Sequence, residues 1–295
     1  MRGFSLVELL MALLIMLGVC SALFGLMNPA QAMFAVQAEL PDMQQRLRAA
    51  ADALGRDLLM AGGGGFPPIV PYRRGLESPD APGTFRSDRV SVLYLSASGP
   101  QATLTQPTDG SGVAAVGARP GCPAGDPLCG FRAGMLAVIF DGTGAYDMIG
   151  LSGVSNEPPA LLHVGSPLSK AYPPGATIAQ AEAATYWLQT DVGGHVVQLM
   201  KYDGQQTDLP VVDNIAELRF EYYIDALTRL DPESLRDGPW LPDSTFAHRF
   251  DADLLRVRRV RATIRVRANQ MVLHAPVGDR QMSLEIAPRS QIVLP

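Results

Sequence analysis

Hydrophobic residues are concentrated at the start of the chain, where residues 4–27 form an almost unbroken apolar run. Within this run the only charged residue is Glu8, and the next charged residue along the chain is Glu39. A helix of this length reaches across the hydrocarbon core of a bilayer, which is about 30 Å thick. The pattern therefore predicts an N-terminal helix that crosses a membrane or directs export.

The helical pattern continues beyond the apolar run, because apolar residues then recur at every third or fourth position. The predicted stripe consists of Leu47, Ala51, Leu54, Leu58 and Ala61. Residues 62–65 are all glycine, and a glycine run does not hold helical order, so the helix is predicted to end there.

Prolines and charged pairs add detail to this helix. Pro29 and Pro41 each remove a backbone donor, so the helix is predicted to bend or locally melt at both positions. On the polar side, the four-residue spacing of Asp42 with Arg46 and of Asp52 with Arg56 predicts two ion pairs.

Residues 66–295 show strand-like patterns separated by glycine and proline turns. Short apolar runs occupy residues 89–96, 134–141, 184–190 and 196–202, and residues 191–194 form a hairpin-like turn between the last two. Alternation is clearest after Asn214, where Leu218, Phe220, Tyr222 and Ile224 share one side and Tyr223 lies on the other, and a similar pattern follows Val260. No long amphipathic helix separates these strands, so the expected fold class is α+β, with a long N-terminal helix packed on an antiparallel sheet.

Three interpretations of the N-terminal run compete. A secretory signal peptide is one, since Ala30-Gln31-Ala32 offers a cleavage site, although the run exceeds the usual apolar length of about 7–15 residues. A plain membrane anchor is the second, and the third must explain Glu8. An ionised carboxylate deep in lipid costs about 2.5–3.5 kcal/mol. Glu8 therefore either reaches water at the membrane face or meets a cationic partner inside an assembly.

The segment Gly3-Phe4-Ser5-Leu6-Val7-Glu8-Leu9-Leu10 closely resembles the class III signal of type IV prepilins and type II secretion pseudopilins. In that family a prepilin peptidase cuts after the glycine, and the new terminal residue is N-methylated. The resemblance implies cleavage between Gly3 and Phe4, methylation of Phe4, and pairing of Glu8 with the terminal amine of a neighbouring subunit. It divides the chain into a leader (1–3), a helix (4–61) and a β-rich periplasmic or extracellular domain (66–295).

Looser cues in residues 54–62, 186–188, 212–222 and 257–264 resemble the PilW-like minor pilins. They imply a pilin-like fold and a structural subunit that helps to initiate pilus assembly, with the pilus tip as a candidate position. The implied partners are the prepilin peptidase, other minor and major pilins, and the inner-membrane assembly platform. The implied location is the bacterial inner membrane, with a single span, and then the pilus, periplasm or cell surface. The alternatives are a J-type minor pseudopilin of type II secretion, which has a smaller body, and a pilus-borne adhesin or DNA-binding module.

Charge and composition narrow the function classes. Lys plus Arg is 24 and Asp plus Glu is 29, which gives a net charge of −5 and argues against a general nucleic-acid binder. One basic run interrupts this balance and consists of Arg256, Arg258, Arg259, Arg261, Arg265 and Arg267. It is interpreted as a solvated strand face paired with acids, and the alternative is a patch for DNA or for an acidic partner subunit.

Few residues suggest chemistry. Cys122 and Cys129 flank a proline- and glycine-rich loop, and in an exported domain they are predicted to form a disulfide; free thiols or half of a metal site are the alternatives. Asp141 and Asp147 flank a glycine turn, which is interpreted as a plain turn with a calcium site as the alternative. The four histidines show no triad spacing, and no phosphate-binding loop is present. No enzyme activity, cofactor or metal is expected.

Overall fold

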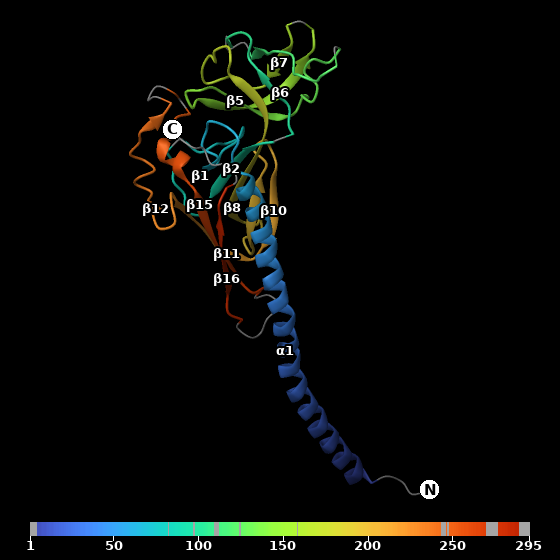
Figure 1. Cartoon of the computed structure of the whole chain (residues 1–295). Coiled ribbons are helices and arrows are strands. Elements are labelled where there is room, and N and C mark those ends of the chain that lie inside the picture. Colours follow the sequence, from blue (N-terminus) through green and yellow to red (C-terminus); the bar gives the residue numbers. More distant parts are fainter. Residues whose placement is uncertain are drawn as a thin grey trace.

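A computed structural model describes residues 5–81, 83–96, 98–108, 112–123, 125–157, 159–242, 246, 248–269 and 277–288. One long helix leaves a body built of strands, and the first half of the helix extends away from that body (Figure 1). The fold class is α+β, as the sequence patterns predict. Gly3 and Phe4 lie outside the described residues.

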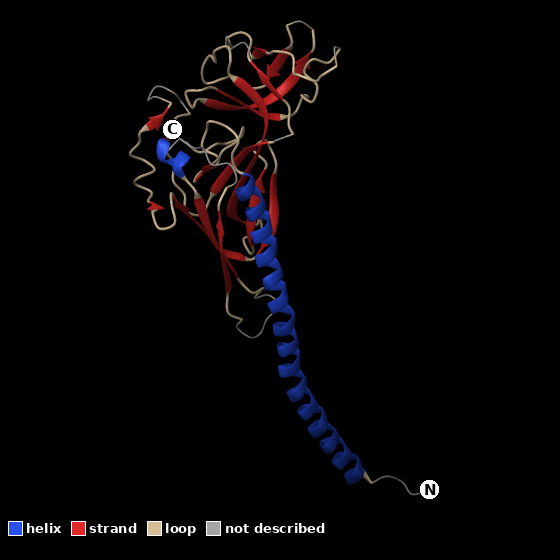
Figure 2. Ribbon diagram, in the orientation of Figure 1, coloured by secondary structure: helices blue, strands red, loops and turns tan. Residues whose placement is uncertain are grey.

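The helix α1 runs without interruption from Leu6 to Met60, a length of 55 residues. Its buried stripe in the second half consists of Met43, Leu47, Ala50, Leu54, Leu58 and Ala61. Ala50 takes the core position that the spacing had given to Ala51, which is only half-buried. The predicted local melting at Pro29 and Pro41 is wrong, since α1 continues through both residues with a gentle curve (Figure 2). Each proline removes one hydrogen bond, and the other bonds of the helix remain to hold it.

The glycine run ends α1, as predicted, and it also joins the helix to the sheet. Ala61 is extended, and Gly62 then has a φ of +128°, a region that favours glycine. The amide of Gly62 donates to the carbonyl of Leu93 (3.1 Å), and the carbonyl of Gly62 accepts from the amide of Leu95 (3.0 Å). The chain therefore leaves the helix directly onto the edge of a strand.

The body contains three sheets within the described residues, and every ladder between named strands is antiparallel. A ten-stranded sheet follows the order β1-β2-β8-β5-β6-β7-β4, with β3 and β9 also paired to β8 and β10 paired to β9. Its strands are β1 (Ile69–Val70), β2 (Val90–Leu95), β3 (Gln101–Thr103), β4 (Val113–Ala115), β5 (Leu136–Phe140), β6 (Tyr146–Ser155), β7 (Leu161–Val164), β8 (Thr177–Thr190), β9 (Val197–Tyr202) and β10 (Asp208–Asp213).

A four-stranded sheet has the order β12-β11-β15-β16, and a small third sheet pairs β13 with β14. These strands are β11 (Ile215–Tyr223), β12 (Arg229–Leu230), β13 (Trp240–Leu241), β14 (Phe250–Asp251), β15 (Arg259–Val266) and β16 (Arg280–Ile286), with the short helix η1 (Ala252–Arg256) between β14 and β15. The second half of α1 packs on β15, β16, β10 and β2.

Alternation along β11 and β15 determines which side chains meet the helix. The core positions Leu218, Phe220 and Tyr222 of β11 are buried, as the period of two predicts. Tyr223 was expected on the exposed side, but it is only 7% exposed. The guanidinium groups of Arg259 and Arg261 lie 4.7 and 5.1 Å from its ring centroid and cover it.

The described residues of the body form two large hydrophobic cores, to both of which β8 contributes, and a small third cluster of Trp187, Met200 and Tyr202. The main core contains the buried stripe of α1 together with β2, β11 and β15. A distal core is formed by side chains of β3 to β7 and lies at the end of the body away from α1 (Figure 1). Residues 177–180 of β8 pair with β5, whereas residues 181–190 pair with β2 and β9. We call the part around the distal core, residues 101–176, the distal lobe.

A buried carboxylate fastens α1 to the ten-stranded sheet. Asp57 is 4% exposed, and its Oδ2 accepts a hydrogen bond from the Tyr186 hydroxyl (2.7 Å). The same oxygen forms an ion pair with Lys201 Nζ (2.6 Å). Tyr186 and Lys201 are directly opposite each other on β8 and β9. Burial, followed by the charge of Asp57, raises the pKa of the Tyr186 phenol, so this hydroxyl stays protonated as the donor.

Replacing Asp57 with asparagine removes this charge and keeps the side-chain shape. We expect Asp57→Asn to lower the free energy of unfolding by about 1–3 kcal/mol, because a buried charge-assisted hydrogen bond and an ion pair are lost. Asp52→Asn is the matched control, since Asp52 is exposed on the same helix and makes no ion pair with any described residue. Its effect should stay within about 0.5 kcal/mol.

The measurement is denaturant unfolding of the full chain in mild detergent, followed by the fluorescence of its two tryptophans, Trp240 and Trp187, the second of which neighbours Tyr186 on β8. Equal losses in the two variants would show that Asp57 does not hold the helix.

Candidate functional site

The largest unusual surface is the first half of α1. Leu6–Met27 has a mean hydropathy of 2.6, and none of it is buried in the structure. The exposed large apolar side chains here are Leu6, Val7, Leu9, Leu10, Met11, Leu13, Leu14, Ile15, Met16, Leu17, Val19, Leu23, Phe24, Leu26 and Met27. Soluble monomers rarely expose a continuous apolar surface of this kind, so it requires lipid or protein around it. Its length and composition suit a membrane span, and a signal sequence would have the same properties.

Glu8 is the one carboxylate on this surface, and the structure uses it locally. Its Oε2 accepts a hydrogen bond from the backbone amide of Ser5 (3.1 Å), and Ser5 Oγ accepts one from the amide of Val7 (3.3 Å). This is a capping box, in which both side chains satisfy amides that have no partner inside the helix. A negative charge here also interacts favourably with the helix dipole. The carboxylate of Glu8 therefore lies beside Ser5, the residue directly after Phe4.

A second buried carboxylate marks the point where α1 leaves the body. Glu39 is 8% exposed, and its Oε1 accepts hydrogen bonds from the amide of Asn269 (2.9 Å) and from Arg46 Nη1 (3.2 Å). Arg46 also pairs with Asp42, as the four-residue spacing predicts. Among the described residues, the structure records no ion pair between Asp52 and Arg56.

Sequence reasoning missed the roles of Glu39 and Asp57, although a signal was present. Glu39 lies four residues before Met43 on the buried stripe, and Asp57 lies three residues after the stripe residue Leu54. An acidic residue on the apolar face of a helix needs a partner where that face is buried. This position alone could have identified both residues as docking points.

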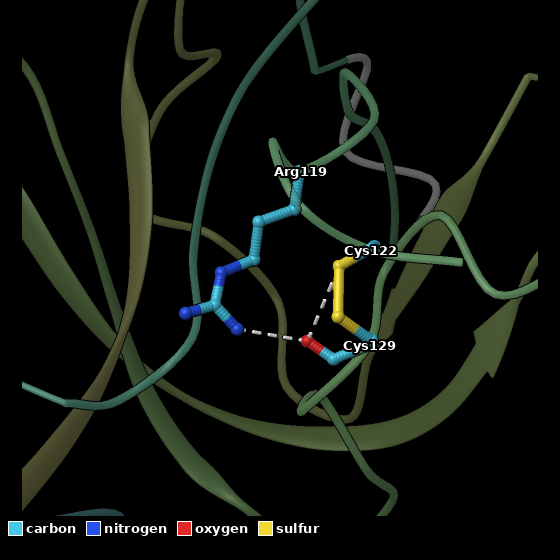
Figure 3. Close-up of a disulfide and its surroundings, with 3 residues drawn as sticks. All are labelled: Arg119, Cys122 and Cys129. Carbon is cyan, nitrogen blue, oxygen red and sulfur yellow. Dashed lines mark hydrogen bonds between the residues drawn. A yellow bond between two sulfur atoms is a disulfide. The ribbon is translucent and has the colours of Figure 1, made fainter. Parts of the chain in front are cut away.

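Cys122 and Cys129 lie in the distal lobe and are joined by a disulfide, with a Cα–Cα distance of 5.6 Å (Figure 3). Arg119 Nη1 donates to the carbonyl of Cys129 (2.9 Å), which ties the closed loop to the preceding chain. Cys20 is a free thiol on the apolar half of α1. Within the described residues, no three His, Cys, Asp or Glu side chains are grouped to hold a metal ion.

Asp141 and Asp147 are each occupied by separate protein partners. Asp141 accepts hydrogen bonds from Lys170 Nζ (2.7 Å) and from the amide of Thr143 (2.9 Å). Its burial acts to raise the pKa of the carboxyl, but these hydrogen bonds outweigh burial and hold the pKa below its usual value. Asp147 accepts from the Ser169 amide and hydroxyl and from the Tyr172 hydroxyl. Neither carboxylate belongs to a group of three or more His, Cys, Asp or Glu side chains within the described residues, whereas a calcium ion takes six to eight oxygen ligands.

Nearby carboxylates neutralise the charge of the basic run. Each pair has an N–O distance of 4.0 Å or less: Arg256–Asp253, Arg259–Glu285, Arg261–Glu221, Arg261–Glu285, Arg265–Glu217, Arg265–Asp279 and Arg267–Asp279. Burial acts to raise the pKa of the Glu221 carboxyl, but hydrogen bonds from the Tyr223 hydroxyl and from Arg229 outweigh it and hold this pKa below its usual value. The hydrogen bond from Arg261 lowers the pKa of the Glu285 carboxyl, so both acids remain ionised at neutral pH. Most of the positive charge on β15 is thus neutralised within the protein.

Comparisons with protein-family models, with curated proteins and with solved structures found no match to this chain.

The disulfide leads to a test of thiol content. We expect alkylation of the denatured, unreduced protein to label one cysteine, Cys20, and alkylation after reduction to label all three. Because the closed loop is short, its loss should cost about 2.5 kcal/mol of stability at most. Peptide mapping by mass spectrometry is the measurement, and labelling of Cys122 and Cys129 before reduction would contradict the pairing. Cys20→Ser serves as the control, and should give no label before reduction.

Proposed function

We propose that this chain is a minor type IV pilin of the PilW-like kind, a structural subunit that helps to start pilus assembly. The observation that carries the proposal is one continuous helix with two different halves. Leu6–Met27 is apolar and exposed, whereas the second half is buried against the sheets through the stripe that ends at Ala61. A subunit that packs its helix among similar helices, and keeps its body outside the bundle, needs this division.

Glu8 supports the same proposal. In a bundle of apolar helices the carboxylate would be removed from water, and an unpaired charge there is costly. Cleavage after Gly3 would create a cationic amine at Phe4, one residue before Ser5, whose amide already donates to Glu8. We propose that in the filament the amine of a neighbouring subunit pairs with Glu8. Before assembly, the same helix would hold the chain in the inner membrane as a single span.

The proposed partners are the prepilin peptidase, other minor and major pilins, and the inner-membrane assembly platform. A J-type minor pseudopilin of type II secretion would share the division of α1 and the carboxylate near its start. The proposal prefers the pilus because the body is large, with a distal lobe that has its own core. The proposed role is assembly and not catalysis.

The distal lobe favours one further candidate, a pilus-borne binding module. This lobe lies at the end of the body away from the exposed half of α1 (Figure 1), where a bound ligand would not compete with helix packing. A DNA ligand is the weaker form of this alternative, because carboxylates neutralise most of the arginines of β15. Loss of pili on gene deletion would support assembly, whereas loss of adhesion with intact pili would support binding.

Cleavage after Gly3 is testable by mass. We expect Gly3→Leu to remain unprocessed, because in the pilin family the peptidase accepts little beyond glycine at this position. Gly25→Ala is a matched control, since a Cβ at Gly25 would meet no atom within 4 Å and should leave processing intact. Intact-mass analysis of the membrane fraction is the measurement. A mature chain that begins at Met33 would mean ordinary signal peptidase and would overturn the proposal.

Two variants separate the capping role of Glu8 from its charge. Glutamine can accept the Ser5 amide in a capping box as glutamate does, but it has no charge to pair with an amine. We expect Glu8→Gln and Glu8→Ala both to reduce recruitment into sheared pili by about tenfold or more. Membrane abundance should stay the same or rise, because both changes make the span more apolar.

Recruitment and membrane abundance are measured side by side by immunoblotting. Normal recruitment of Glu8→Gln, with loss only in Glu8→Ala, would assign Glu8 to capping alone. Reduced membrane abundance would place the defect in targeting and would contradict the pairing.

A further inference from the structure

A cavity of about 210 Å³ lies beside the irregular segment 71–80, where this segment meets β6 and the chain that follows β7. Its lining includes Arg74, Leu76, Tyr146, Met148, Ser166 and His248. Liquid water occupies about 30 Å³ per molecule, so a molecule of several non-hydrogen atoms fits this volume. The cavity is far from the exposed half of α1 in the sequence and shares no residue with it.

Arg74 is the unusual residue of this cavity. It is 5% exposed, and Nη1 donates to the carbonyl of Pro67 (2.9 Å). Its Nε and Nη2 are buried without a hydrogen-bond partner among the described residues, and no described carboxylate forms an ion pair with it. The guanidinium carbon lies 5.3 Å from the ring centroid of Tyr146, a contact that leaves both nitrogens unbonded. A buried guanidinium with two unused donors costs free energy in the folded state. Its neighbour Arg73 pairs with Asp208, so nearby arginines do have anionic partners.

The backbone holds Arg74 firmly in this position. Its amide donates to Ser91 Oγ (3.0 Å), and its carbonyl accepts from Thr185 Oγ1 (3.3 Å), both of which are buried. Ser91 Oγ and Thr185 Oγ1 are themselves 2.6 Å apart. The start of the side chain is therefore fixed by β2 and β8, and the unpaired charge is a built feature of this site.

The unused polar groups at the cavity can all donate hydrogen bonds, although a hydroxyl can also accept. Ser166 Oγ is also buried without a partner. The two carboxylates in the lining are already engaged: Asp80 accepts from the Arg73 amide (2.7 Å), and Asp147 accepts from Ser169 (2.8 Å). Neither carboxylate is hydrogen-bonded to the unused groups of Arg74 and Ser166, so these groups still lack an anionic acceptor.

We propose that this cavity binds a small organic carboxylate, whose two oxygens accept from Nε and Nη2 of Arg74 and whose charge neutralises it. This edge of a guanidinium matches a carboxylate in a bidentate arrangement. The Ser166 hydroxyl is the further donor, and Leu76 and Met148 supply apolar contacts for the carbon atoms. Asp80 and Asp147 at the same cavity would repel a phosphate dianion more than a carboxylate with one charge.

Entry of the guest requires a small movement, because both unused nitrogens are covered in the structure. Because Ser91 and Thr185 hold the backbone of Arg74, the movement is one of its side chain, whose hydrogen bond to the carbonyl of Pro67 would open.

The test is the melting temperature of the full chain in a non-ionic detergent, titrated with acetate at constant ionic strength. We expect a saturable rise with acetate, no rise with the neutral analogue acetamide, and a smaller rise with inorganic phosphate. Carbon-13 acetate line broadening, displaced by excess unlabelled acetate, measures binding directly on the unmodified protein.

Variants then assign the site. Arg74→Met should reduce the apparent acetate affinity about tenfold or more, and without acetate it should melt no lower than the parent, because an unpaired buried charge is removed. Arg86→Met is the matched control, since Arg86 is half-exposed, pairs with Asp80 and does not line the cavity. It should keep the acetate response. Ser166→Ala should weaken acetate binding several-fold. It replaces Arg74→Met as the test variant if Arg74→Met does not fold.

Three results would overturn the proposal. Equal effects of acetate and acetamide would mean a cavity that holds water only. A response to phosphate as strong as that to acetate would exclude a preference for carboxylate. An unchanged acetate response in Arg74→Met, or in Ser166→Ala where Arg74→Met does not fold, would place the binding elsewhere. None of these results depends on the proposed role in pilus assembly.

Discussion

The burial of Asp57 between α1 and the sheet is the interaction on which the arrangement of the molecule depends. A charge inside an interface is tolerated only where its partners are in place, and here Tyr186 and Lys201 approach from neighbouring strands. Apolar packing along the stripe of α1 would permit the helix to rotate or slide slightly. The carboxylate does not permit this, because a shift by one turn would leave a charge and a phenol unpaired in the interior.

Glu39 repeats the same constraint at the other end of the docked half. It is 18 residues before Asp57, which corresponds to about 27 Å along a helix axis. Two fixed points at this distance define both the direction and the rotation of α1 relative to the body. The direction in which the exposed half points is therefore set by the body and not by the exposed half itself.

Local periodicity was enough to predict the helix and the best strands. The stripe from Leu47 to Ala61 and the alternation in β11 and β15 follow from side-chain geometry within a single element. The residue Tyr223 was misplaced because its cover comes from arginines on another strand. Continuity through Pro29 and Pro41 was missed because one lost hydrogen bond was weighed without the remaining length of the helix.

The candidate sites also differ in how far the sequence alone could predict them. Glu8 could be singled out from the sequence because a lone charge in an apolar run is a local signal, whereas Gly3 and Phe4 rest on the family resemblance. The cavity at Arg74 could not be predicted, since its lining comes from segments as far apart in the sequence as Tyr72 and His248, a separation of 176 residues. Only the fold reveals that this arginine, one of many on the chain, has no carboxylate partner among the residues that the structure describes.

The pairing of β8 has a consequence for how the chain could change over evolution. Leu95 at the end of β2 lies directly opposite Ala181 on β8, so the chain leaves the part of the ten-stranded sheet that borders the main core and returns to it at neighbouring points. The whole distal lobe is therefore equivalent to one enlarged hairpin connection. Insertions are tolerated where the ends of the inserted segment lie close together. The lobe contributes Leu136, Val138 and Tyr146 to the main core, so a lobe of another size or shape would have to keep these contacts. The residues that hold Asp57 of α1, Tyr186 and Lys201, lie outside the lobe. The distal lobe could therefore vary while the exposed half of α1, which enters a membrane or an assembly, stays the same.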